Sequence, residues 1–111
     1  MPRLVPVSDT SRRLEAEWQD HLRVGALWRL VNQMDTRKDI KTGIPYLKRD
    51  LYDNYPGQPV YIAKGTLAIY VGSERVNEMG KDGPLRLLRH SFIVGCGKYI
   101  ITDFHNIEPV I

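Results

Sequence analysis

The sequence predicts an α+β protein in which a long N-terminal helix and a short second helix pack on a small antiparallel barrel of four to five strands. Up to Tyr55 the apolar residues recur at helical spacing. After the Pro-Gly-Gln-Pro segment at 56–59 they form short alternating runs separated by glycine, which is typical of strands. We therefore expect a helical arm over residues 1–55 and a β-barrel over residues 56–111. So small a barrel is near the lower limit of independent stability, so both parts are expected to form one cooperative domain.

The long helix is predicted from about Ser11 to Met34. Several capping residues stand in the Ser-Asp-Thr-Ser run at 8–11, and acidic residues follow where a helix N-terminus favours negative charge. Two apolar stripes run along the helix: Leu14, Trp18, Leu22 and Ala26 form the first, and Val24, Leu27, Trp28, Val31 and Met34 form the second. A helix that is apolar on most sides must be covered on most sides. Either the rest of the chain covers both stripes, or one stripe docks on another protein.

A short second helix is predicted over residues 45–52. Residues 35–39 form a polar loop after the first helix, and Pro45 then stands at an early helical position, which suits proline. Leu47 and Leu51 are four residues apart and would lie on the same side of this helix.

The C-terminal half is expected to hold short strands joined by glycine turns. The predicted strands are Val60–Ala63, Thr66–Val71, Leu85–Val94, Lys98–Phe104 and Ile107–Val110. Lys64-Gly65 and Gly95-Cys96-Gly97 are predicted turns, and residues 72–84 are predicted as a polar loop, with a short strand at Arg75-Val76-Asn77 as an alternative within it. The alternation in Leu85–Val94 changes phase, which favours a β-bulge or a sharp bend. Strands this short must close into a barrel or pack against the helices to hide their edges.

The order of these parts resembles the SH3-like small barrel, including its KOW-type versions. The residues behind the resemblance are Gly57-Gln58-Pro59-Val60-Tyr61-Ile62, the run from Lys64 to Val71, and the run from Phe104 to Val110. In that superfold a one-turn helix commonly precedes a short closing strand, and His105-Asn106 stands where the turn would lie. Signalling SH3 domains bind proline-rich peptides in an aromatic groove, whereas the β half of this chain has no tryptophan. The resemblance therefore implies a barrel but not this peptide binding.

Composition and charge are those of an ordinary globular domain. Hydrophobic residues make up 42% and charged residues 26% of the chain, and the net charge is +3. The single cysteine, Cys96, allows no intramolecular disulfide and suits a reducing compartment. No apolar run approaches the ~20 residues of a membrane span, and the first residues lack the apolar core of a signal peptide. We expect a soluble cytoplasmic protein, or a virion component if the chain is viral, with no membrane contact.

The function that the sequence favours is a non-enzymatic protein-binding module without a cofactor. It would be an adaptor or accessory subunit that docks on a larger protein assembly, and its partner would be another protein or a second copy. A phage origin fits a small, mildly basic protein of this kind. The candidate anchors on the long helix are Trp18, Leu27, Trp28 and Val31. Tryptophan is enriched at the energetic centres of interfaces.

Nucleic-acid binding is the main alternative. Basic residues are densest between residues 37 and 49, with tyrosine among them, and the candidate contacts are Arg37, Lys38, Lys41, Tyr46, Lys48 and Arg49. Cations bind phosphates and aromatic rings stack on bases. Four aspartates in or near the same stretch offset much of its positive field.

A small thiol hydrolase is a more distant alternative. Cys96, Asp103 and His105 lie close in sequence and are residue types that form a nucleophile, an orienting group and a base. Cys96 stands in a Gly-Cys-Gly turn, however, where its small size explains it equally well. The three histidines are scattered along the chain without the spacing of a zinc site, so no metal is expected.

Overall fold

The computed structural model describes residues 9–38, 42–49, 60–80 and 82–111. These residues form one eight-stranded mixed sheet with one α-helix, so the predicted long helix on a barrel of four to five antiparallel strands is wrong. The elements are α1 (Asp9–Glu17), η1 (Gln19–His21), β1 (Leu27–Leu30), β2 (Met34–Lys38), β3 (Pro45–Lys48), β4 (Tyr61–Ile62), β5 (Leu67–Gly80), β6 (Gly83–Val94), β7 (Gly97–Ile101), η2 (Phe104–Asn106) and β8 (Ile107–Pro109), where η marks a one-turn 3₁₀-helix. The strand order is β4-β2-β3-β7-β6-β5-β1-β8, and β3 and β7 pair in parallel.

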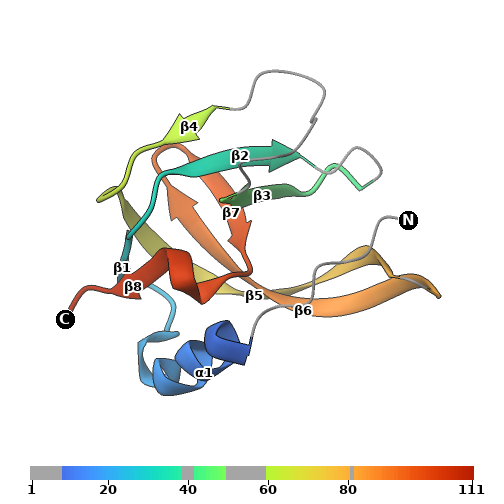
Figure 1. The fold of residues 1–111 in the computed structure, drawn as a ribbon, viewed down its shortest axis with the longest axis horizontal. Coiled ribbons are helices and arrows are strands. Elements are labelled where there is room, and N and C mark those ends of the chain that lie inside the picture. The colour runs from blue at the N-terminus through green and yellow to red at the C-terminus, as the bar shows by residue number, and fades with distance from the viewer. Residues whose placement is uncertain (1–8, 39–41, 50–59, 81) are drawn as a thin grey trace.

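The sheet is strongly curled, and the main hydrophobic core fills its inside (Figure 1). Its buried members are Trp28, Leu30, Met34, Leu47, Ala68, Tyr70, Phe92, Val94, Ile101, Phe104 and Ile107. Leu14, Trp18 and Leu22, from α1 and the turns after it, pack against this core. A smaller cluster of Tyr46, Val76 and Ile100 lies on the other side of the sheet. Strands from both halves of the chain therefore share one sheet.

The helix predicted over residues 11–34 ends early, at Glu17. Gly25 has φ +92°, a left-handed conformation that favours glycine and interrupts a helix. The chain then runs as β1, in which the first and third residues are exposed and the second and fourth are buried. This is the two-residue alternation of a strand. Part of the segment that the sequence predicts as an apolar helix is therefore a strand. A strand presents its side chains on two faces, so these residues do not need cover on all sides.

The short helix predicted over residues 45–52 is also wrong in its described part, because Pro45–Lys48 form β3. Residues 50–52 lie outside the described residues. β3 pairs antiparallel with β2 and parallel with β7. So short a helix is marginal on its own, whereas two neighbouring strands supply hydrogen-bond partners on both sides of this segment.

The polar loop predicted at 72–84 is the far part of a long hairpin. β5 and β6 pair from Ala68 and Val94 out to Gly80 and Gly83. A register shift between Tyr70 and Gly72 marks a β-bulge. The bulge lies in β5, opposite the segment of β6 in which the sequence predicts an irregularity.

Three local predictions in the C-terminal half are confirmed. At the Lys64-Gly65 turn, Gly65 has φ +89° and the amide of Thr66 donates to the carbonyl of Ala63. The Gly-Cys-Gly segment turns the chain between β6 and β7. The one-turn helix η2 precedes the closing strand β8, which pairs with β1.

Candidate functional site

An exposed apolar row crosses the outer face of the sheet, on the side of β1, β5 and β6 away from the core. Leu27 pairs with Ile69, and Ile69 pairs with Ile93, so the three residues are direct neighbours on adjacent strands. Their exposed fractions are 38%, 42% and 40%. Leu67 stands two residues before Ile69, on the same side of β5, and is also exposed. We call Leu27, Leu67, Ile69 and Ile93 the outer apolar face.

The core explains why these four side chains point outward. Successive side chains of a strand point to opposite sides. Trp28, Ala68 and Val94 stand next to the outer residues in sequence and are buried in the main core. Because these neighbours point into the core, the side chains of Leu27, Leu67, Ile69 and Ile93 point outward. Hydrophobic residues scattered singly on a surface need no explanation, whereas a contiguous group is a candidate interaction surface.

Ion pairs flank the outer apolar face on two opposite sides. On the β1–β8 side, Arg29 Nη2 lies 2.7 Å from Glu108 Oε1. On the β7 side, Lys98 Nζ lies 3.2 Å from Glu74 Oε2, and Lys98 is the cross-strand neighbour of Ile93. Both pairs are exposed to solvent, so each adds little to stability. Their charges stand at the edges of the face, where a bound partner would meet them.

Val24 extends this surface beside the β-bulge. Its side chain is among the most exposed apolar groups of the described chain. A Cβ atom at Gly72 would lie 3.9 Å from Val24 Cγ2, so the valine packs over the backbone of the bulge. The amide of Gly25 donates to the carbonyl of Tyr70 at 2.8 Å and holds this segment against β5.

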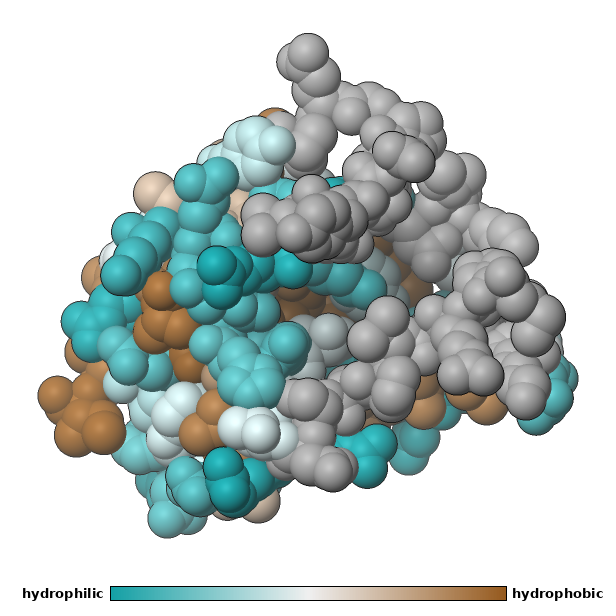
Figure 2. Space-filling view, in the orientation of Figure 1, coloured by the Kyte–Doolittle hydropathy of each residue, from teal (hydrophilic) through white to brown (hydrophobic). Residues whose placement is uncertain are grey.

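The C-terminal residues add apolar surface beside Leu27. The amide of Val110 donates to the carbonyl of Leu27 at 3.0 Å, and the side chains of Val110 and Ile111 are exposed. Figure 2 shows hydrophobic surface at the lower left, where the C-terminus lies, while hydrophilic side chains cover much of the rest of the described surface in that view.

The structure separates the four predicted protein-binding anchors. Leu27 belongs to the outer apolar face. Trp28 is fully buried, and its ring meets three other aromatic rings edge-on. Trp18 is one of these neighbours and is half-buried against the core, and Val31 is half-buried as well. The tryptophan that looks like an interface anchor in the sequence therefore holds the core together.

Of the predicted nucleic-acid contacts that the structure describes, two are buried and three are exposed. Arg37 and Tyr46 are buried, with 8% and 5% of their surface exposed. Arg37 Nη2 lies 3.4 Å from Asp35 Oδ2, and Lys48 Nζ lies 4.9 Å from the centre of the Tyr46 ring. A buried guanidinium does not reach phosphate, and a buried phenol ring does not stack on a base. Lys38, Lys48 and Arg49 are exposed, and Lys41 lies outside the described residues.

The proposed thiol and its base lie beyond opposite ends of β7. Cys96 is exposed just before this strand, and His105 follows its far end. Five extended residues span about 16 Å. His105 Nδ1 instead lies 2.8 Å from Asp103 Oδ1. The structure thus gives Cys96 no histidine base among the three residues that the sequence groups together.

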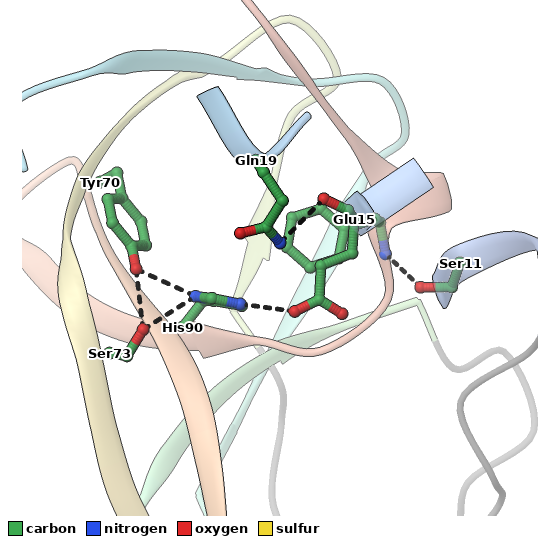
Figure 3. Close-up of polar contacts among 7 residues, drawn as sticks. Ser11, Glu15, Gln19, Tyr70, Ser73 and His90 are labelled. Carbon is green, nitrogen blue, oxygen red and sulfur yellow. Dashed lines mark hydrogen bonds and ion pairs between the residues drawn. The ribbon is translucent and has the colours of Figure 1, made fainter. Parts of the chain in front are cut away.

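A polar cluster that the sequence analysis does not single out joins α1 to the β5–β6 hairpin (Figure 3). His90 Nε2 lies 2.7 Å from Glu15 Oε1, while His90 Nδ1 lies 3.0 Å from the Tyr70 hydroxyl and 3.1 Å from Ser73 Oγ. A carboxylate only accepts hydrogen bonds, so Nε2 donates to Glu15, while Nδ1 is hydrogen-bonded to the two hydroxyls. Glu15 and His90 are 75 residues apart, so no spacing in the sequence could have paired them.

A serine, a histidine and a carboxylate in contact are also the groups of many hydrolytic enzymes. Such catalysis further needs donors aimed at a developing oxyanion. Here the Tyr70 hydroxyl lies 2.9 Å from Ser73 Oγ and 3.0 Å from His90 Nδ1, so both hydroxyls and the imidazole bond to one another. We assign this cluster the role of docking α1 on the sheet.

Comparisons with known proteins do not identify a family. No family model matches this chain, and no curated protein or solved structure matches it either. Across the described ranges, no helix has the length and apolarity to cross a membrane. Within the same ranges, no three histidine, cysteine or acidic side chains gather as a metal site would require. The candidate site is the outer apolar face, which rests on the register and exposure of its own residues.

Proposed function

We propose that this chain is a non-enzymatic protein-binding module, an adaptor or accessory subunit, whose contact surface is the outer apolar face. The observation that supports the proposal is the row of Leu27, Ile69 and Ile93, which stand in register on three strands and remain exposed. An apolar centre with charged groups at its edges is the ordinary anatomy of a protein interface. Arg29 and Lys98, each with its acidic neighbour, supply those edges.

The sheet beneath the face suits this role because it holds the apolar side chains in place before a partner arrives. Trp28, Ala68 and Val94 fix the strands from the core side, so binding does not have to order the backbone. Part of the entropic cost of association comes from ordering groups at the interface. A rigid strand surface lowers that part of the cost.

We also propose that the protein works in a reducing compartment, the cytoplasm, or in a virion if the chain is viral. Its one cysteine, Cys96, is exposed and carries no disulfide. A free exposed thiol is common where the environment keeps thiols reduced.

The proposal is tested by placing a charge at the centre of the face. We expect Ile69→Asp and Leu27→Asp to lose the partner that co-purifies with the tagged wild-type chain from its native source, because burying an unpaired carboxylate at an interface is unfavourable. Leu88→Asp makes the same kind of change at an exposed leucine on the opposite side of β6 and should keep the partner. Near-ultraviolet circular dichroism checks that each variant is folded.

A folded Ile69→Asp variant that still retains the partner would contradict the proposal. Substitution of Trp28 is not a useful test, since this residue is fully buried and its loss disturbs the core itself.

A further inference from the structure

We infer that an exposed edge of β5 binds an extended, acidic segment of another protein, which adds to the sheet as a further strand. The edge lies along the far part of the β5–β6 hairpin and is separate from the outer apolar face. The inference therefore goes beyond the proposed function and adds a second contact surface. An unpaired strand edge is a template for such addition, in which main-chain hydrogen bonds give affinity and side chains give specificity.

One side of β5 lacks a neighbouring strand beyond the β-bulge. β1 pairs with residues 67–69 of β5, and the last backbone hydrogen bond on this side runs from the amide of Gly25 to the carbonyl of Tyr70. The chain leaves the sheet at Gly25, whose φ is +92°. Over residues 72–80, β5 pairs with β6 alone among the described residues. In Figure 1 this part of the hairpin extends to the right, beyond β1.

Alternate residues of this stretch turn their backbone groups toward the exposed edge. In an antiparallel pair, every second residue bonds to the partner strand and the residues between them face away from it. Tyr70 bonds toward β1, so Ile69 faces β6. Ile69 and Gly72 stand opposite β6 residues that are two apart, so Gly72 faces β6 as well. The residues that face away then include Ser73, Arg75 and Asn77, all of them exposed, and we call their backbone N–H and C=O groups the open edge.

Arg75 on the open edge indicates that the added segment is acidic. Its side chain is exposed and forms no ion pair with any described residue. The two acidic residues of β5, Glu74 and Glu78, lie on the other side of the strand, where they contact Lys98 and Arg89. Opposite charges on neighbouring strands attract, so a carboxylate on an added strand is favoured beside Arg75.

A second arginine stands on the same side of the hairpin. Arg86 is the cross-strand neighbour of Asn77, is exposed, and likewise has no ion pair within the described part of the chain. Glu15, the acidic residue that α1 directs to this side, contacts His90. The charges of the two arginines are thus left for a partner. A second copy of this chain fits less well, because two open edges paired about their centre would place Arg75 against Arg75.

The other side of the hairpin is anchored, so the open edge is ordered before a partner arrives. Val76 packs with Tyr46 and Ile100 in the smaller cluster. Glu78 accepts hydrogen bonds from the Tyr46 hydroxyl and from Arg89. Ordering groups at an interface is part of the cost of binding, and this anchoring lowers that part of the cost.

A short labelled peptide tests the inference on the full chain. The probe is a heptapeptide in which glutamate alternates with valine, so that its carboxylates lie on one side of a strand and valine favours the extended form. Fluorescence anisotropy should show saturable binding with a dissociation constant below about 1 mM. A control peptide with the same glutamates and with proline in place of each valine should bind at least about tenfold more weakly, because proline supplies no N–H to the ladder.

Two variants test the charge and the strand addition separately. Arg75→Glu should weaken binding about fivefold or more, because it sets like charges on neighbouring strands. Lys64→Glu makes the same charge reversal at the turn before β5 and should bind like the wild type. Asn77→Pro removes an outward N–H, which a strand edge tolerates, and should weaken binding although the charge is unchanged. Near-ultraviolet circular dichroism checks that each variant is folded.

Amide hydrogen exchange followed by NMR locates the bound peptide. In the free chain the amides of Ser73, Arg75 and Asn77 should exchange faster than those of Glu74 and Val76, which bond to β6. The alternating peptide should slow exchange at the three outward amides.

The outcomes separate this inference from the proposed function. The inference is overturned by the absence of saturable binding up to about 1 mM, by equal binding of the proline peptide, or by slow exchange of the outward amides in the free chain. Ile69→Asp disrupts the outer apolar face and should still bind the peptide. A folded Ile69→Asp variant that loses the peptide would move its binding to the outer apolar face and overturn the inference as well. Co-purification with Ile69→Asp therefore tests the proposed function alone.

Discussion

Glu78 is a buried carboxylate that its neighbours hold in the charged form. Arg89 donates to both of its oxygens, at 2.8 and 3.1 Å, and the Tyr46 hydroxyl donates at 3.1 Å. Burial by itself raises the pKa of Glu78, but the hydrogen bonds and charge of Arg89 outweigh it, so the pKa of Glu78 lies below its ordinary value. The same contact raises the pKa of Arg89. This group joins the far part of the hairpin to β3.

Glu78→Gln should therefore cost stability in a pH-dependent way. A depressed folded-state pKa contributes stability above the unfolded pKa, and that contribution is lost as the pH falls through the folded pKa. We expect a loss of about 2 kcal/mol in the free energy of unfolding at pH 7, typical of hydrogen bonds to a charged group. The difference in the free energy of unfolding between Glu78→Gln and the wild type should narrow below the ordinary pKa of glutamate. Urea unfolding across a pH series measures this difference.

The matched control for this residue is Glu74→Gln. Glu74 is also a strand glutamate with one cationic partner, but the Lys98–Glu74 pair is exposed, so its loss should change stability little. If the difference in the free energy of unfolding between Glu78→Gln and the wild type stays constant from neutral to acid pH, the charge of Glu78 does not contribute to stability.

At the scale of elements, α1 is a short helix whose position depends on contacts with distant strands. Its Ser11 side chain is fully buried, and Ser11 Oγ accepts a hydrogen bond from the amide of Phe104 at 2.8 Å. Glu15, one turn further along, contacts His90 on β6. Helices this short gain most of their stability from packing. The two polar contacts therefore set where α1 lies beside η2 and the β5–β6 hairpin (Figure 1).

Ser11→Ala should loosen this helix. The substitution removes the acceptor for a buried amide, which costs about 1–3 kcal/mol. We expect faster amide hydrogen exchange in α1 and η2, with the strands β5 and β6 less affected. Thr10→Ala changes the exposed neighbour and should leave exchange unchanged. Equal protection of α1 in both variants would show that the Ser11 contact does not position the helix.

At the scale of the whole molecule, the net charge is +3, and some cations of the described residues are buried or stand next to carboxylates. In the stretch that the sequence favours for nucleic-acid contact, Arg37 and Tyr46 are buried. Exposed cations elsewhere on the described chain, such as Arg29 and Lys98, stand next to carboxylates. Long-range attraction of phosphate needs cations on one face, and the buried Arg37 and the paired Arg29 and Lys98 add little to such a face.

We therefore expect only weak binding to single-stranded DNA. At about 150 mM salt the dissociation constant should lie at the weak end, ~10⁻⁴ M, of the range of about 10⁻⁴ to 10⁻⁶ M that is typical of non-specific contact. Fluorescence anisotropy with a labelled oligonucleotide measures this dissociation constant, and Lys48→Glu should leave it unchanged. The nucleic-acid alternative would be restored by much tighter binding. Its salt dependence would have to indicate contacts to several phosphates, and the binding would have to be lost in Lys48→Glu.

The candidate site shows how far sequence reasoning reaches. The alternation of Leu67, Ile69 and Val71 predicts that these residues share one side of a strand. Pattern alone does not say whether that side meets the core or the solvent. Tertiary pairing decided it, because Trp28, Ala68 and Val94 together fill the inside of the sheet. Leu27 is the one predicted anchor that lies on the exposed side.

The amino-acid sequence by itself determined the glycine turns and the absence of an intramolecular disulfide, because each depends on neighbouring residues or on composition alone. The one-turn helix before the closing strand was implied by the resemblance to SH3-like barrels. Only the tertiary structure decided that Leu27–Leu30 and Pro45–Lys48 are strands and that residues 72–80 extend one. A helix closes its hydrogen bonds within a segment, whereas a strand takes them from partners elsewhere in the chain. For β1 those partners are β5 and β8, which the local pattern around residue 27 does not reveal.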